Sequence, residues 1–290
     1  IAPCSPLPLR AGVGLKPQHY PSALERVSAG IPLLPEAPGW FEVHPQNYFG
    51  AGGPPHCWLT AFAAAAPISF HSVGLSLGSH EGVNLDELEA LAVLCERYAP
   101  AMVSDHLSWS GSASNRYPDL LPVPYTAQAL DHFAAQVGRV QDRLGRTMLI
   151  ENPSRYLAFA GDTMSEADFL HALCARSGCG LLLDINNIEV SATNLGLDAD
   201  AMVDAINPAL VGEVHLAGHA REEHAHGTLL IDDHGSAVSH ETWRLFERFV
   251  QRAGPRPVLI EWDTDVPEFD VLLTEAALAD AILRRAQRNH

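Results

Sequence analysis

The chain has 290 residues, 47% of them hydrophobic, and its net charge is −17. A chain of this length can bury a large core, either in one barrel or in two smaller domains. It contains no run of about 18 apolar residues, so we expect no membrane-spanning helix. The negative charge disfavours phosphate backbones, so we expect neither nucleic acid nor a membrane as a partner.

Eight strand-like segments alternate with helical segments along the chain. We expect strands at 11–16, 39–46, 67–75, 102–108, 147–153, 180–188, 210–218 and 257–263. The clearest amphipathic helices are predicted at 85–98, 127–144, 166–176 and 241–253. Asn84, Thr126, Ser165 and Ser239 are the expected N-caps, and Gly145, Gly178 and Gly254 follow the helices.

Eight strand-then-helix units predict an α/β fold, a closed (β/α)8 TIM barrel that forms one domain over residues 1–290. A doubly wound open sheet is the alternative, but it needs a glycine-rich phosphate turn, and Gly12-Val13-Gly14 lacks the third glycine in register. Two insertions, 110–125 and 219–239, follow the fourth and seventh strands and are expected to surround the pocket at the C-terminal face.

Six of the apolar runs end in a histidine or a carboxylate, which packing does not explain because such groups are costly to bury unpaired. The six residues are His71, His106, Glu151, Asp184, His215 and Glu261. One histidine at a strand end is more often a hydrogen-bonded structural residue than a ligand. Six at equivalent positions instead predict one polynuclear metal site at the mouth of the barrel.

The predicted ligands fall into three groups, and imidazole with carboxylate suits Fe, Zn or Mn. His71, His106 and Glu151 form the first, and Glu151, Asp184, His215 and Glu261 form the second, with Glu151 as the bridge between two ions. Asp232 and His234 form the third, because alternate side chains of an extended segment point the same way. The amide oxygen of Asn187 is expected to complete it. Glu151, Asp184 and His106 are the predicted catalytic residues.

Four further polar residues are predicted to line the mouth as substrate contacts or as supports for the ligands. His44 and Asn47 follow the second strand, and Asp105 precedes His106 and is expected to orient a ligand. His219 follows His215 by four residues and is interpreted as a proton donor, a spare ligand or a support.

The five cysteines are an odd number and show no zinc-type CxxC spacing. We see no basic segment followed by an apolar stretch, as a signal peptide would have. Both features predict a reducing, cytoplasmic location without a disulfide framework.

The motifs together resemble a known family. They include Gly12-Val13-Gly14-Leu15, Phe41-Glu42-Val43-His44, Ser69-Phe70-His71-Ser72-Val73-Gly74-Leu75-Ser76, Asp105-His106-Leu107-Ser108-Trp109, Leu149-Ile150-Glu151-Asn152-Pro153-Ser154, Leu183-Asp184-Ile185-Asn186-Asn187, Glu213-Val214-His215-Leu216-Ala217-Gly218-His219, Asp232-Asp233-His234-Gly235 and Leu259-Ile260-Glu261-Trp262-Asp263. Over nearly its whole length the chain resembles the multinuclear non-haem iron-dependent oxidative enzymes, TIM-barrel proteins of the thiaglutamate, bufferin and methanobactin type that modify cysteines in ribosomally made peptides. Asp105 stands where that family more often has Glu.

The resemblance implies two or three iron ions, in mixed Fe(II) and Fe(III) states, with O2 as co-substrate. The substrate would be a cysteine of a precursor peptide, whose thiolate binds iron. The implied products are an oxazolone with thioamide, a thiooxazole, or excision of the β-carbon from a C-terminal cysteine, which we favour slightly. A small partner protein that binds the leader peptide, in a heterodimer, is also implied.

Related barrels supply the alternatives. The chain also resembles apurinic endonucleases and xylose-isomerase-like barrels, which place His, Glu, Asp, His and Glu at the same strand ends, although Asn187 stands where the endonucleases are expected to have His. A phosphodiesterase would need Lys/Arg clusters on its loops. A sugar isomerase would need a catalytic Lys or a His–Asp pair, and Lys16 is the only lysine. A non-catalytic metal-storage barrel is the third alternative.

Overall fold

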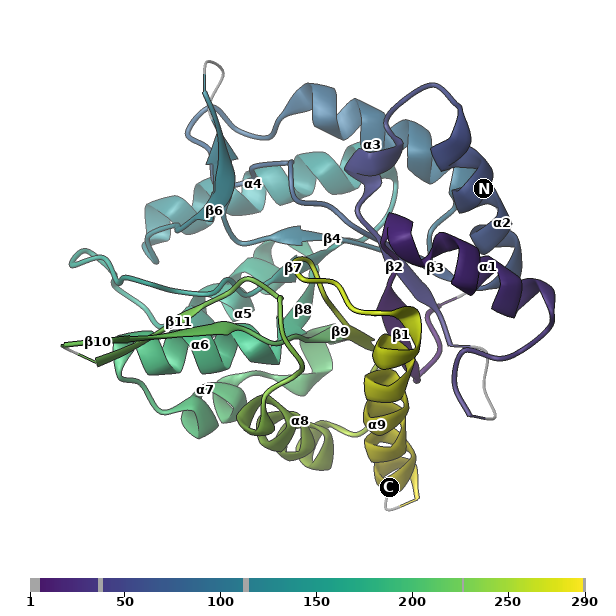
Figure 1. Ribbon diagram of the computed structural model, residues 1–290. Helices are drawn as coiled ribbons and strands as arrows, with labels where there is room; N and C mark the ends of the chain where they lie inside the picture. The colour runs from purple at the N-terminus through teal and green to yellow at the C-terminus, as the bar shows by residue number, and fades with distance from the viewer. Residues whose placement is uncertain (1–5, 36–38, 112–114, 226, 289–290) are drawn as a thin grey trace.

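The computed structural model describes residues 6–35, 39–111, 115–225 and 227–288. Eight parallel strands close into a barrel (Figure 1). Around the barrel they follow their order in the sequence, β1-β2-β3-β4-β7-β8-β9-β12, and β12 pairs with β1. The barrel strands are β1 (Ala11–Gly14), β2 (Phe41–Val43), β3 (Ile68–His71), β4 (Met102–His106), β7 (Leu149–Glu151), β8 (Gly180–Asp184), β9 (Val211–Leu216) and β12 (Val258–Ile260). The predicted (β/α)8 barrel is confirmed.

Helices surround the barrel on the outside (Figure 1). They are α1 (Tyr20–Ser28), α2 (Pro54–Ala65), α3 (Leu85–Tyr98), α4 (Ala127–Leu144), α5 (Glu166–Ser177), α6 (Ile185–Leu195), α7 (Ala199–Ala205), α8 (His240–Ala253) and α9 (Phe269–Gln287), with short 3-10 turns η1 (Pro17–His19), η2 (Pro45–Tyr48) and η3 (Pro208–Leu210). Within the described residues, no helix combines the length and the apolar composition that spanning a bilayer requires.

The predicted start and stop signals shape the helices as expected. The side chains of Asn84, Thr126, Ser165 and Ser239 each accept a backbone N–H bond from the residue three positions on. This satisfies a donor that the first helical turn leaves free. Gly145 and Gly178 end α4 and α5 in the left-handed conformation, which a glycine adopts without a steric penalty.

The barrel strands are shorter than predicted, and at β8 the difference has a clear physical cause. The strand was predicted over 180–188 but ends at Asp184, where α6 begins. The Asp184 carboxylate accepts the backbone N–H of Asn187 at 2.7 Å and so caps the helix. Asn187 therefore lies in the first turn of a helix directly above the strand end.

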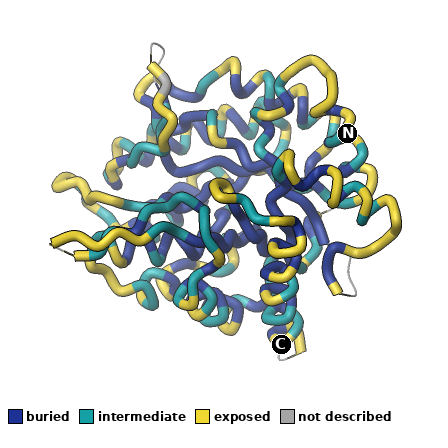
Figure 2. Tube along the Cα trace, in the orientation of Figure 1, coloured by how far each residue is buried: buried dark blue, intermediate teal, exposed yellow. Residues whose placement is uncertain are grey.

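The two predicted insertions form antiparallel hairpins that extend from the body of the barrel (Figure 1). β5 (Trp109–Gly111) pairs with β6 (Arg116–Leu121), and β10 (Ala220–His224) pairs with β11 (Gly227–Ile231). Figure 2 shows that the outer end of the β10–β11 hairpin is exposed, whereas the barrel strands are buried. Both hairpins follow the C-terminal ends of barrel strands, so they surround its mouth, as predicted.

Candidate metal centre

The parallel register brings the predicted strand-end residues together at one rim of the barrel. His106 of β4 lies opposite Glu151 of β7, and Asp184 of β8 lies opposite His215 of β9. These four residues are at most 6% exposed. The barrel thus collects imidazole and carboxylate groups from separate strands at its C-terminal mouth, where active sites of this fold form.

The first predicted group is assembled in the structure. Nε2 of His71 lies 3.2 Å from Glu151 Oε2, and Nε2 of His106 lies 3.3 Å from the same oxygen. The two Nε2 atoms are 3.2 Å apart. On the far side of the His71 ring, Nδ1 lies 2.8 Å from the Ser104 hydroxyl, which fixes the ring with Nε2 facing the centre. The three residues could hold a metal ion.

The residues of the second predicted group fall into two sets that have Asp184 in common. Glu151, Asp184 and His215 offer ligand atoms within 4.8 Å of one another, and so do Asp184, His234 and Glu261. Glu261 Oε2 also lies 3.1 Å from His215 Nδ1 and 3.4 Å from His234 Nδ1. Because Glu151 and Asp184 each belong to two sets, the sets form one connected cluster.

Of the residues predicted for the third group, His234 belongs to this cluster, and Asp232 and Asn187 contact its members. Asp232 Oδ1 is 2.7 Å from His234 Nε2, as expected for two side chains that point the same way. The segment is not extended, however, because His234 has φ 47°. Asn187 donates its amide to Glu151 Oε1 at 3.2 Å and to the Asn152 carbonyl at 3.0 Å, which leaves its buried Oδ1 without a partner.

The four predicted supporting residues occupy different places. His44 lies 4.0 Å from Glu261 Oε1, at the outer edge of the cluster. Asp105 accepts the backbone N–H groups of Leu75 and His106 and so holds the end of β4. The structure does not bring Asn47 among the buried groups, because Asn47 is exposed on η2.

His219 supports the cluster through an amide. Its Nδ1 lies 2.7 Å from Asn186 Oδ1, and Asn186 Nδ2 donates to Asp232 Oδ1 at 2.9 Å. The His219 ring thus orients the Asn186 amide, which in turn holds the carboxylate of Asp232, a predicted ligand.

Three carboxylates of the site were not predicted. Glu42 Oε1 and Glu213 Oε1 lie 3.3 and 3.6 Å from His215 Nε2, inside the barrel and below its mouth. Asp263 Oδ2 lies 3.3 Å from His234 Nδ1. Glu42 and Glu213 stand within strands rather than at their ends. The sequence feature that could have identified Glu42 and Glu213 is a carboxylate within an otherwise apolar strand.

Buried polar atoms at the mouth lack hydrogen-bond partners, and this observation tests whether the site suits a metal. Asp184 Oδ2, Asn187 Oδ1 and His106 Nδ1 make no hydrogen bond, and Glu151 Oε2 and both ring nitrogens of His215 and His234 lie within 3.4 Å of an ion-pair partner but without hydrogen-bond geometry. Unpaired buried polar atoms are costly and uncommon in native proteins. Cations would satisfy them, and histidine with carboxylate is a donor set for Fe, Mn or Zn. The residues therefore fit a metal cluster.

Some of the buried carboxyl groups bind a proton more readily than usual when no metal is bound. Burial raises the pKa of Glu151 to about 8 and that of Asp184 to about 7. Burial alone would lower the pKa of His106, but the nearby Glu151 and Asp105 raise it to about 9. Glu261 differs: burial would raise its pKa, yet His234 and His215 hold it at about 2.

These shifts predict that the metal-free protein loses stability as pH rises from about 5 to about 9. The raised pKa values mean that the folded chain binds more protons than the unfolded chain across this range, so the free energy of unfolding falls with pH, by a few kcal/mol in total. Two groups act in the opposite sense: Glu261 below about pH 4.5, and His71, whose pKa burial lowers, below about pH 6.5. The melting temperature measured in a chelator at each pH checks this.

Metal binding should remove that pH dependence, because ions replace the protons. The rise in melting temperature on adding metal should therefore grow between pH 6 and pH 8. A metal-free protein whose melting temperature is constant or rises over this range would contradict these pKa shifts.

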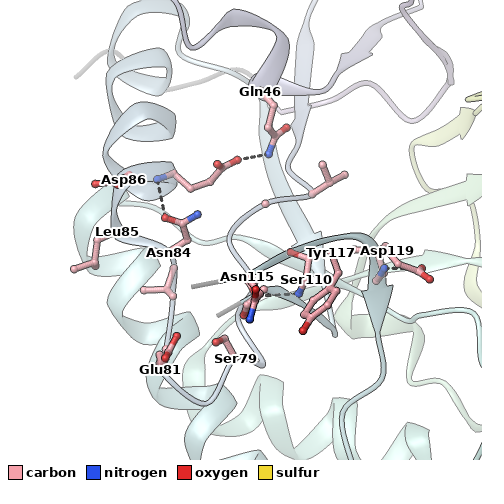
Figure 3. Close-up of a pocket in the computed structure, with 18 of the residues that line it drawn as sticks. Gln46, Ser79, Glu81, Asn84, Leu85, Asp86, Ser110, Asn115, Tyr117 and Asp119 are labelled. Atoms are coloured by element: carbon pink, nitrogen blue, oxygen red, sulfur yellow. Dashed lines mark hydrogen bonds between the residues drawn. The ribbon is translucent and has the colours of Figure 1, made fainter. Parts of the chain in front are cut away.

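A groove of about 820 Å³ opens beside the mouth (Figure 3). One wall is formed by the loop between β3 and α3, and the other by the β5–β6 hairpin, which presents Tyr117 and Asp119. Gln46 joins the groove to the barrel, because its amide donates to Ser72, the residue after His71, at 2.9 Å and to Glu87 at 2.7 Å. Among the described residues that line the groove, four are acidic and none is Lys or Arg.

The fold and the site define a (β/α)8 TIM barrel whose mouth could hold metal ions. A xylose-isomerase-like TIM-barrel protein from Mycobacterium smegmatis, in complex with magnesium, is similar over 96% of this chain and 97% of its own, with 12% identity and a TM-score of 0.58. Endonuclease IV from Thermus thermophilus is similar over 97% of this chain and all of its own, with 15% identity and a TM-score of 0.54. At this identity the likeness concerns the fold alone.

The chain belongs to the family of RiPP precursor modification enzymes MbnB/TglH/ChrH, whose model matches residues 10–284. A UPF0276 protein of Caulobacter sp. strain K31 is 48% identical over 94% of this chain and 96% of its own length. A UPF0276 protein of Chromobacterium violaceum is 45% identical over 96% of each chain. The resemblance to peptide-modifying enzymes is confirmed.

Proposed function

We propose that the protein oxidises a cysteine of a ribosomally made precursor peptide, using two or three iron ions and O2. One observation carries the proposal. Buried histidine and carboxylate groups of a RiPP-modifying barrel converge at its mouth, and three of the carboxylates, Glu151, Asp184 and Glu261, each belong to two candidate metal groups. The donor set alone suits iron, manganese or zinc. Among these metals, the resemblance to the multinuclear non-haem iron-dependent oxidative enzymes favours iron.

The residues of the chain would hold and orient the metal. His71, His106 and Glu151 would form one site, and Asp184, His215, His234 and Glu261 would form the neighbouring sites with Asn187 and Asp232. Bound iron would supply the one-electron and O2 chemistry that no side chain provides. Glu42 and Glu213 would fix the His215 ring from below, as the carboxylate partners of ligating histidines do. Burial of the ligands excludes water from the reaction.

The groove beside the mouth supports a peptide substrate. It lies between the loop after His71 and the hairpin that follows His106, so we expect a peptide bound in it to approach the first metal group. The four acidic residues favour a peptide segment that is neutral or basic, which agrees with the net charge of −17.

A partner protein and one product type complete the proposal. We propose that a small protein binds the leader peptide and docks beside the mouth. Three exposed apolar side chains in the loop after β7, those of Tyr156, Leu157 and Phe159, offer a contact surface. We favour excision of the β-carbon from a C-terminal cysteine over thiooxazole or oxazolone formation.

The test is anaerobic reconstitution with iron, followed by exposure of a cysteine-containing candidate peptide to O2 and mass spectrometry. We expect a mass change confined to cysteine that is absent with metal-free protein and with a Cys→Ser peptide. An unchanged peptide, together with cleavage of abasic DNA by zinc-loaded protein, would instead identify a hydrolase.

A further inference from the structure

Lys16, the only lysine of the chain, lies at the metal-binding mouth. It follows β1, and its ammonium donates to His44 Nε2 at 2.9 Å and forms an ion pair with Asp263. The lysine side chain is only 13% exposed. Because a lysine usually extends its ammonium into solvent, this placement requires an explanation.

The His44 ring is oriented to accept this hydrogen bond. Its Nδ1 lies 3.2 Å from the carbonyl oxygen of His71, and a carbonyl can only accept, so Nδ1 carries the proton. Nε2 therefore has its lone pair available for Lys16. A lysine ammonium has three N–H donors, and within the described residues Lys16 has two polar partners, His44 and Asp263. The third donor is left for another group.

Lys16, His44 and Asp263 form an outer layer of the mouth. Their side chains are 13%, 21% and 37% exposed, whereas those of Glu261 and His215 are 4% and 0% exposed. Within the described chain, no arginine forms an ion pair with a residue of the candidate metal groups. Lys16 thus places a cationic side chain in this outer layer, where its partners His44 and Asp263 form a further candidate metal group with Glu261.

The distance from Lys16 to the inner layer matches a cysteine residue. Contacts of 2.9 Å from Lys16 to His44 and 4.0 Å from His44 to Glu261 place the ammonium within about 7 Å of Glu261 Oε1. In a C-terminal cysteine, the thiol and the carboxylate are separated by four bonds, or roughly 4–5 Å. A thiol among the inner groups would therefore bring its own carboxylate to the lysine.

We infer that Lys16 forms a subsite for a carboxylate of the substrate, next to the thiol that enters the metal centre. This inference rests on the proposed function and deepens it, because it assigns a substrate class: thiols that carry a carboxylate close to the sulfur. The carboxylate comes either from a C-terminal cysteine or from an acidic side chain beside the cysteine, and both would make the same charge-assisted hydrogen bond.

The test uses iron-loaded protein under anaerobic conditions and reads thiol binding from the thiolate-to-iron absorption band, without turnover. The probes are N-acetyl-cysteine, N-acetyl-cysteine amide and N-acetyl-Asp-Cys amide. We expect the free acid to bind roughly 10-fold more tightly than the amide, as a hydrogen bond between charged groups allows. Tighter binding of the Asp-Cys amide than of the free acid would assign the subsite to a neighbouring acidic residue.

Variants show whether Lys16 is responsible. In Lys16→Met the free acid and the amide should bind equally within about twofold, with the affinity for the amide unchanged. Lys16→Arg should keep part of the preference. Arg155→Met is the matched control, because Arg155 pairs with Asp162 in the loop after β7. This variant should keep the full preference for the free acid over the amide.

Each other result overturns the inference. Equal binding of the acid and the amides by the unmodified protein would remove it while leaving thiol binding intact. A preference that persists in Lys16→Met would do the same. If none of the probes produces the absorption band, the proposed function falls, and this inference falls with it.

Discussion

Replacing Glu151 with alanine is expected to remove at least two metal ions and to abolish activity. Glu151 is shared by the group with His71 and His106 and by the group with Asp184 and His215. Loss of a residue that only supports a ligand costs about 10–100-fold in metal affinity or activity, so loss of a shared ligand should cost at least about 100-fold. Metal content per chain, measured after reconstitution and desalting, checks this prediction.

The control for this variant is a second buried glutamate. Glu166 on α5 is also buried and accepts a hydrogen bond from the Tyr125 hydroxyl at 2.8 Å, but it belongs to no candidate metal group among the described residues. Glu166→Gln should keep full metal content. If Glu151→Ala also kept its full iron content, Glu151 could not be the bridge.

Replacing His71 with alanine is expected to lower turnover at least about 100-fold while the barrel stays folded. The ring contacts Ser104, His106 and Glu151 at the mouth, and the hydrophobic core is built from other residues. We therefore expect a normal far-ultraviolet circular dichroism spectrum and a melting temperature only a few degrees lower.

His56 provides the matched control for the loss of a buried imidazole. It lies in α2, where its ring contacts the Tyr98 hydroxyl at 2.8 Å and the Gly50 carbonyl at 2.6 Å. His56→Ala should lower stability and leave turnover per folded molecule unchanged. An unfolded His71→Ala protein would show that His71 is a structural residue, and full activity would show that it is dispensable.

The sequence predicted the parts of the site that depend on local pattern. The C-terminal ends of the buried strands lie at the mouth of a parallel barrel, so His106, Glu151, Asp184 and His215 could be located from the apolar runs alone. The predicted ranges of α3 and α4 also agree with the structure, because cap residues mark the ends of these helices in the sequence.

The rest of the site depends on barrel closure, which local pattern does not show. Glu213 lies within hydrogen-bonding reach of Ser69, 144 positions away, and Glu42 reaches His215 across the interior. A carboxylate within a strand also has the simpler interpretation of an outward-facing residue. The β8 boundary was wrong because Asp184 acts both as the last residue of a strand and as a helix cap, and only its hydrogen bond to Asn187 distinguishes the two roles.

The most direct test of the central claim is a crystal structure of the iron-reconstituted protein, with anomalous diffraction recorded at the iron absorption edge. We predict at least two anomalous peaks within about 2.0–2.3 Å of oxygen or nitrogen atoms of Glu151, Asp184, His215 and Glu261. A mouth without peaks, or a single ion that leaves Glu151 uncoordinated, would contradict a polynuclear centre.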